Sequence, residues 1–178
     1  MEVMMDKSKY KIIEEYYDRL KELKESGEIV NVYGCFEADA EVLGDFAEFF
    51  YVNYKENMPD WVNAYMQLHA WQFQRCHEGV ATYYENLYGN TDYGSILRAA
   101  EYLAGTGHKE LSEKLKAPAH EGAEDDSCPC PIEDYGKLII ETEGWIDDNE
   151  ERIFGCYLEL LLGNENHFLA ALKGEKDT

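Results

Sequence analysis

Apolar residues recur at helical spacing through the first third of the chain. One run predicts a helix that ends near Gly27, where a C-terminal cap belongs, and it consists of Ile12, Ile13, Tyr16, Tyr17, Leu20 and Leu23. A second run predicts a helix over about 38–53 and consists of Val42, Leu43, Phe46, Phe49 and Phe50. Residues 28–36 between them fit a short strand or an irregular connector. The pattern therefore predicts two amphipathic helices here.

Glycine and proline divide the remainder into shorter helices. Pro59 and Asp60 start a helix over about 60–77, with Asp60 as its N-cap, and Gly79 ends it. Further helices are predicted over about 80–88, 92–104, 108–116, 131–147, 149–162 and 165–172. Residues 117–130 (APAHEGAEDDSCPC) predict an exposed acidic loop. The fold class that follows is all-α: a single compact domain of about seven to nine helices spanning residues 1–178.

The negative charge is concentrated in two segments. The chain has 37 acidic and 16 basic residues and a net charge of −21. Residues 28–54 contain six acids and no base, and residues 117–151 contain twelve acids and one base, Lys137. These segments hold 17 of the 21 excess charges, whereas residues 1–27 are almost balanced. Such a chain repels nucleic acid and anionic membranes and attracts basic partners.

Helical phase places several of these carboxylates opposite the apolar stripes. Glu37, Glu41, Asp45 and Glu48 share one outer face, and Asp134, Glu141 and Asp148 share another. We expect the acidic residues of the two segments to contact a partner, and the candidates are Glu37, Glu41, Asp45, Glu48, Glu121, Glu124, Asp125, Asp126, Asp134, Glu141, Asp147, Asp148 and Glu151. The alternative interpretation is an ordinary solvated helix face.

Motifs of common enzymes are absent from the sequence. There is no phosphate-binding or dinucleotide-binding glycine loop and no G-x-S-x-G elbow. Cys76 and His77 are neighbours on a helix and point about 100° apart, so we interpret Cys76 as a packed thiol beside a surface histidine. His120, Cys128 and Cys130 could ligate zinc, but Cys-Pro-Cys is tighter than the usual spacing, so we interpret the cysteines as free. We expect no metal and no cofactor.

Localisation is predicted from the absence of two features. No apolar run approaches the roughly 20 residues that span a bilayer, and the start, MEVMMDKSKYK, has no hydrophobic signal core. Five widely spaced cysteines indicate reduced thiols rather than a disulfide framework. We therefore expect a cytoplasmic protein, either a monomer or a homodimer.

Residues 60–113 carry a pattern of helix ends seen in a known family. The segment HEGVATYYENLYGN closes a long helix on glycine, and SILRAAEYLAGTG follows as an alanine-bearing helix. The pattern resembles a bacterial family of uncharacterised all-helical domains that includes a DNA-mimic protein. Residues 146–172 resemble the family pattern more weakly. The chain departs from the family at Glu78–Gly79, where a Gly-Gly pair is usual, and at Thr82, where glutamine is usual. The resemblance implies an all-α fold and no particular site residue.

The charge pattern and the resemblance favour one function over two others. The favoured function is a protein-binding module that presents carboxylates to a basic partner, in the manner of a DNA mimic, without binding nucleic acid itself. An immunity or antitoxin-like protein that neutralises one cognate partner is the first alternative. A carboxylate-metal enzyme, with Asp125 and Asp126 as candidate ligands, is the second.

Overall fold

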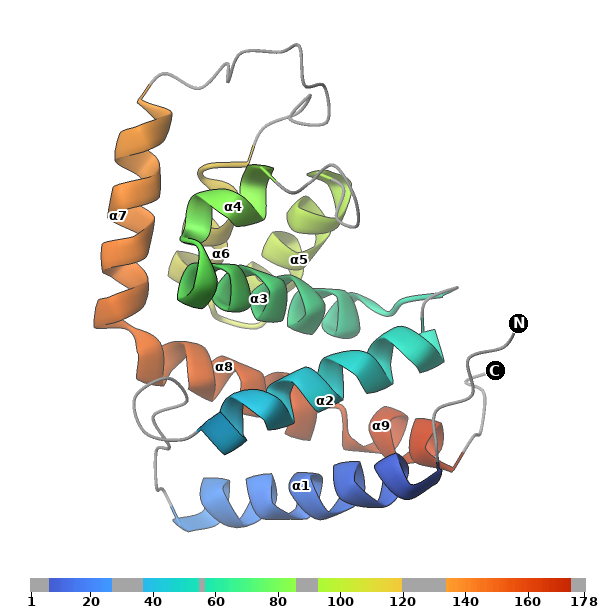
Figure 1. Ribbon diagram of the computed structural model, residues 1–178. Coiled ribbons are helices and arrows are strands. Elements are labelled where there is room, and N and C mark those ends of the chain that lie inside the picture. Colours follow the sequence, from blue (N-terminus) through green and yellow to red (C-terminus); the bar gives the residue numbers. More distant parts are fainter. Residues whose placement is uncertain (1–6, 27–36, 55–56, 86–92, 120–133, 174–178) are drawn as a thin grey trace. The chain divides into compact units, whose positions relative to one another are not determined.

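The computed structural model describes residues 7–26, 37–54, 57–85, 93–119 and 134–173. Within these ranges it has nine helices and no strand (Figure 1). The helices are α1 (Lys7–Ser26), α2 (Glu37–Tyr54), α3 (Asp60–His77), α4 (Val80–Glu85), α5 (Tyr93–Gly105), α6 (Lys109–Lys116), α7 (Tyr135–Asp148), α8 (Glu150–Leu162) and α9 (Glu165–Leu172). The predicted all-α class is confirmed. In the described ranges no helix is long and apolar enough to cross a membrane.

The helices begin and end close to the residues predicted from the sequence. The helix α3 begins at Asp60, and α9 has the predicted bounds. Two glycines that follow helices adopt positive φ, Gly79 at 95° and Gly107 at 101°, a conformation that glycine adopts without a side-chain penalty. Residues 27–36, 86–92 and 120–133 lie outside the described ranges, and so do the predictions made for them.

The contacts within the chain divide it into two compact units. The first comprises residues 1–62 and 150–178, and the second comprises residues 63–149. The first unit therefore contains α1, α2, α8 and α9, and the second contains α4 to α7 with most of α3. The single domain expected from the sequence stays a prediction.

Aromatic side chains form the core of the first unit. Phe46, Phe49 and Phe50 of α2 are fully buried, as their helical spacing predicts. The Phe168 ring lies 5.3 Å from that of Phe49 and stacks on Tyr17 of α1 with ring centroids 4.3 Å apart. Aromatic pairs in such geometries contribute about 0.5–1.5 kcal/mol beyond the area they bury. This cluster therefore joins α1, α2 and α9.

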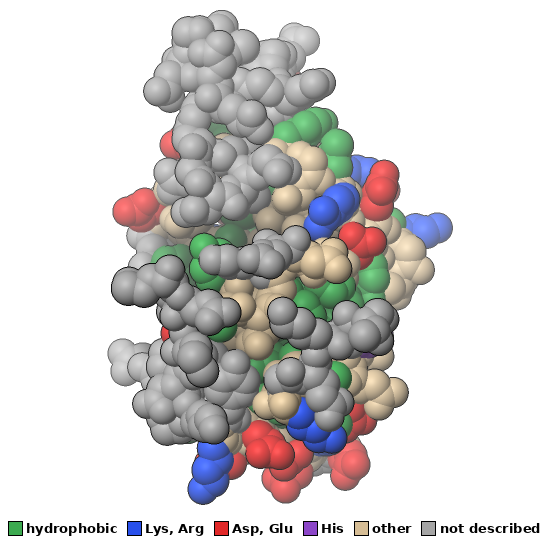
Figure 2. Space-filling model, turned by 90° about the vertical axis from the view of Figure 1, so that its right-hand side faces the viewer, with side chains coloured by type: hydrophobic (Ala, Val, Ile, Leu, Met, Phe, Trp, Pro, Cys, Tyr) green, Lys and Arg blue, Asp and Glu red, His purple; other side chains and the backbone are tan. Residues whose placement is uncertain are grey.

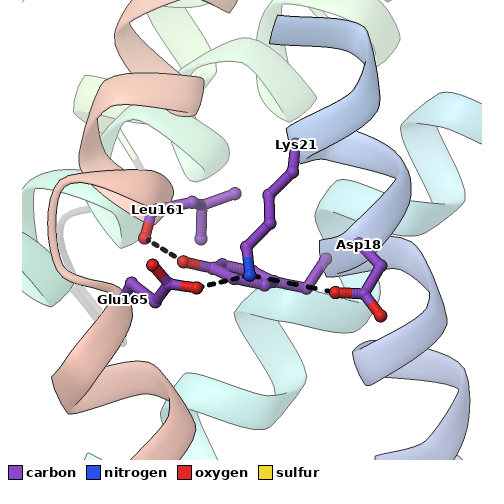
Figure 3. A network of polar contacts seen from close by, with 5 residues as sticks. Asp18, Lys21, Leu161 and Glu165 are labelled. Carbon is purple, nitrogen blue, oxygen red and sulfur yellow. Dashed lines mark hydrogen bonds and ion pairs between the residues drawn. The ribbon is translucent and has the colours of Figure 1, made fainter. Parts of the chain in front are cut away.

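Polar contacts reinforce that cluster around Tyr17 and Lys21 (Figure 3). The Tyr17 hydroxyl donates to the Leu161 carbonyl at 3.1 Å, near the end of α8. The Lys21 ammonium pairs with Glu165, lies 3.9 Å from Asp18 and sits 4.9 Å from the centre of the Tyr17 ring. The hydrogen bond to Glu165 raises the pKa of Lys21. These contacts attach α1 to the junction of α8 and α9.

Two further tyrosines donate from buried hydroxyls in the second unit. Tyr83 donates to the Gln67 side-chain oxygen at 2.6 Å, and Tyr84 donates to the Leu115 carbonyl at 2.8 Å. Burial raises the pKa of both phenols, so both remain neutral donors at physiological pH. In the first unit, Tyr54 makes a similar bond to the His167 carbonyl at 3.1 Å. Buried phenols thus supply hydrogen bonds between helices in both units.

Two local predictions are wrong. Cys76 is exposed rather than packed, because it lies three residues after the exposed Phe73 and therefore on the same side of α3. Pro118 and Ala119, predicted to belong to an exposed loop, are buried. The Ala119 amide donates to the Lys116 carbonyl at 3.0 Å, which folds the chain back directly after α6. The buried cysteine in the described ranges is Cys156, whose pKa burial raises to about 12.

Candidate partner-binding surface

The helix α7 carries the best-defined acidic face and is attached to its unit by the opposite face. Ile139, Thr142 and Ile146 are buried, and the helix contacts α4 and α6 (Figure 1). Three further residues of α7 are half-buried, namely Tyr135, Leu138 and Trp145.

Two acidic residues of α7 hold the helix in place. A Glu143 carboxylate oxygen accepts the Val80 amide at 2.9 Å, at the first residue of α4. Asp147 forms an ion pair with Arg75 of α3. A carboxylate at a helix N-terminus satisfies an amide that has no partner within the helix and interacts favourably with the helix dipole. Glu143 and Asp147 therefore contribute to the fold.

Three other carboxylates are exposed, as predicted: Glu141 and Asp148 lie on α7, and Asp134 lies at its N-cap, although the helix was predicted to begin at about 131. Asp134 has φ 64° and ψ 26°, and its carbonyl accepts the amides of Lys137 and Leu138, while its carboxylate makes no capping hydrogen bond. Lys137, the single basic residue of α7, lies 3.7 Å from Glu141. Three exposed acids and one lysine remain after Glu143 and Asp147 are set aside, so negative charge exceeds positive charge here by two.

The remaining candidates lie in the first unit or outside the described ranges. Glu48 of α2 and Glu151 of α8 are exposed, whereas Asp45 is half-buried. Glu37 and Glu41 lie within α2, but their side chains are outside the description. Four other candidates fall in residues 120–133, outside the described ranges: Glu121, Glu124, Asp125 and Asp126. The described candidates of α2 and α8 thus belong to one unit and those of α7 to the other.

Charge is mixed on α1 and on the described part of the face drawn in Figure 2. On the face drawn in Figure 2, acidic and basic side chains lie beside one another among the described residues. On α1, Lys11 pairs with Glu15 at 3.4 Å, and Lys21 lies between Asp18 and Glu165. In exposed ion pairs of this kind the two opposite charges neutralise each other, and the pair contributes little to stability. The outer face of α7 differs because one lysine faces several carboxylates.

One feature of the α7 surface was missed by sequence reasoning. Ile140 is 71% exposed, the most exposed of the large hydrophobic residues in the described ranges. Gly136 and Gly144, one turn before and after it, are also exposed, and a Cβ added to either would meet no atom within 4 Å. The signal was present in the run Leu138–Ile139–Ile140, because three consecutive residues of a helix cannot all face the same side. Ile140 therefore had to point away from the core.

Comparisons with known proteins do not assign the surface to a family. No family model, no curated protein and no solved structure matches the chain. The resemblance noted for residues 60–113 stays a prediction. In the part of the chain that the structure describes, no three histidine, cysteine or acidic side chains are grouped to hold a metal ion. His120, Cys128 and Cys130 are outside that part.

Proposed function

We propose that this protein is an acidic binding module that presents carboxylates to a basic protein partner. The observation that carries the proposal is the outer face of α7, where Asp134, Glu141 and Asp148 are exposed and Lys137 is the single cation. Solubility alone would be served by charge distributed anywhere on the surface. Here 17 of 21 excess charges lie in two segments, and α7 is part of the more acidic one.

A DNA-binding protein is the class of partner that this charge density fits. Duplex DNA presents about one negative charge per 1.7 Å of its axis, and proteins bind it through lysine and arginine with release of counterions. Side chains three or four positions apart on a helix lie about 5–6 Å from one another, and Glu37, Glu41, Asp45 and Glu48 of α2 have this spacing. The exposed acids Glu141 and Asp148 of α7 are seven positions apart, about 10 Å along the helix axis, and extend the row of negative charge more sparsely. Such a row can occupy a basic surface that otherwise binds phosphates.

The test compares two variants with the same change in net charge. The first replaces the α7 acids (Asp134→Asn, Glu141→Gln, Asp148→Asn), and the second replaces three exposed acids of α1 (Glu14→Gln, Glu22→Gln, Glu25→Gln). Binding to a basic DNA-binding protein such as a histone is measured by calorimetry at low and physiological salt. We expect the α7 variant to bind about tenfold more weakly, from three contacts of about 0.5 kcal/mol each. The α1 variant should bind like the native chain.

Competition with DNA separates the DNA mimic from a general acidic binder. If duplex DNA displaces the protein from the basic partner, both occupy the same surface. If the basic protein binds without competition, the acidic module stands and the DNA-mimic interpretation is wrong. Equal binding at low and physiological salt, or equal losses in the two triple variants, would contradict the proposed role of α7.

A further inference from the structure

One lysine lies within the most acidic part of the chain, on α7. Lys137 is the single base among twelve acids in residues 117–151. Its side chain is 70% exposed, and the ammonium lies 3.7 Å from a carboxylate oxygen of Glu141, whose side chain is 49% exposed. The lysine therefore places a positive charge on the surface that we propose to bind a basic partner.

The stability of α7 does not explain this lysine. Lys137 is the third residue of the helix, in the turn where the helix dipole disfavours a cation. In the pair with Glu141 the lysine precedes the glutamate, which is the weaker of the two orders on a helix. Glutamine has about the same helix propensity as lysine and carries no charge. The local rules of helix stability thus favour glutamine over lysine at this position.

Lys137 belongs to a row of charged side chains along α7. With about 100° between successive residues, Lys137, Glu141 and Asp148 project within about 40° of one another. At 1.5 Å per residue, Glu141 lies about 6 Å beyond the lysine along the helix axis, and Asp148 lies about 16 Å beyond it. All three residues are exposed. From its N-terminal end, the row is therefore positive, then negative, then negative.

We propose that Lys137 determines the specificity of the α7 surface by weakening its binding to uniformly basic partners. This inference rests on the proposed function and names the residue that restricts it. A cation of the partner that pairs with Glu141 comes within about 6 Å of the lysine ammonium, because both approach the same carboxylate. Like charges at that distance in water weaken binding about threefold.

The charge order of the row selects the partner. Phosphates along a strand of DNA all carry the same charge, so a surface that binds them offers cations throughout. Lys137 makes the α7 row differ from such a strand at one end. A basic protein with a carboxylate opposite Lys137, and cations opposite Glu141 and Asp148, avoids the repulsion and gains an ion pair. The partner that fits best is therefore a basic surface that contains an acid.

The experiment uses the full chain and two synthetic peptides of equal length and equal net charge. One peptide contains lysine and glutamine, and the other contains more lysines with glutamates between them. Binding is measured by calorimetry at low and physiological salt. We expect Lys137→Gln to bind the lysine–glutamine peptide about threefold more tightly than the native chain does, and Lys137→Glu about tenfold more tightly. Both gains should be smaller at the higher salt concentration.

Matched controls separate the position of the charge from the net charge. Lys11 of α1 makes the same i,i+4 pair with Glu15, at 3.4 Å, and both side chains are exposed. Lys11→Gln and Lys11→Glu change the net charge equally and should leave binding almost unchanged. Lys137→Arg keeps the positive charge and should bind like the native chain. Lys137→Gln should melt no lower than the native chain, and a lower melting temperature would assign the lysine to the fold instead.

The choice between the two peptides tests the specificity itself. The native chain should prefer the peptide with glutamates, and Lys137→Glu should prefer the lysine–glutamine peptide. Equal gains for Lys137→Gln and Lys11→Gln, or the same preference in the native chain and Lys137→Glu, overturn the inference. A dimer in sedimentation experiments that Lys137→Gln abolishes would assign the lysine to self-association and also overturn it.

The two proposals fail in different ways. If both peptides bind with steep salt dependence but the Lys137 and Lys11 variants behave alike, the acidic module stands and the role of Lys137 is wrong. If neither peptide shows salt-dependent binding, the proposed function fails and the role of Lys137 fails with it.

Discussion

The contact between Glu143 and the first amide of α4 can be tested by removing the carboxylate. Hydrogen bonds to charged groups contribute about 1.5–3 kcal/mol to stability when they are well shielded. Glu143 is half-buried, so in Glu143→Ala a water molecule can partly replace the lost hydrogen bond to the Val80 amide. We therefore expect Glu143→Ala to lower the free energy of unfolding by about 1–2 kcal/mol. Glu143→Gln keeps an acceptor oxygen but loses the charge, and it should cost less than Glu143→Ala.

Gly79 provides an internal check on the same contact. A Cβ at this position would lie 3.1 Å from the Glu143 oxygen, and φ is +95°. We expect Gly79→Ala to cost about 1–2 kcal/mol from the left-handed backbone alone, and more from the crowding. In the Glu143→Ala background the crowding is absent, so only the backbone cost should remain. A double-mutant cycle should therefore show coupling of about 0.5–1 kcal/mol between the two positions.

The assay must report on the second unit, because Glu143, Gly79 and Val80 all belong to it. Hydrogen exchange of the α4 amides, followed by mass spectrometry, measures local opening there, and urea unfolding measures the overall effect. Unchanged exchange in Glu143→Ala would refute the role of this carboxylate. Binding of a basic partner should survive the substitution, because the Glu143 carboxylate is bonded to Val80 and is not one of the exposed acids of the proposed surface.

Two further predictions concern single side chains. Burial lowers the pKa of His69 to about 4, so near pH 6.5 the unfolded chain binds a proton that the folded chain does not bind. The free energy of unfolding should therefore fall by about 2 kcal/mol between pH 7 and pH 5 because of this group. In urea unfolding, His69→Gln should lose that part of the pH dependence. Tyr17→Phe keeps the stacking on Phe168 but removes the hydrogen-bond donor to the Leu161 carbonyl. We expect it to lower the free energy of unfolding by about 1–2 kcal/mol. Equal unfolding midpoints for Tyr17→Phe and the native chain would contradict a stabilising role of this hydrogen bond.

Local pattern was sufficient to predict most of the helices. The phenylalanines of α2 recur at helical spacing and are buried, and Gly79 takes the positive φ expected of a residue that follows a helix. Carboxylates opposite an apolar stripe had to face outward, and this was right for Glu141 and Asp148; Asp134 is also exposed, but it precedes α7 with φ 64° and so does not follow the helical phase. These features depend on neighbours three or four residues away, which the sequence displays directly.

Tertiary contacts could not be predicted from the same pattern. Glu143 and Asp147 carry the same charge as their outward neighbours, yet they contact Val80 and Arg75. Helical phase places Glu143 on the inward side, four residues after Ile139 and three before Ile146. The partners themselves could not be inferred, because they are 63 and 72 residues away in the chain. The error at Cys76 has a similar cause: whether a helix side is covered depends on elements distant in sequence.

The buried tyrosine hydroxyls have a consequence for a chain so poor in cations. The helix α8 has no basic residue in its last turn, where lysine or arginine often serves the terminal carbonyls. Tyr17 donates instead to the Leu161 carbonyl there, and Tyr54 donates to the His167 carbonyl within α9; neither phenol carries a charge. Salt screens charges but leaves neutral hydrogen bonds almost unaffected. Raising the ionic strength should therefore release the proposed basic partner without breaking these hydrogen bonds of the fold.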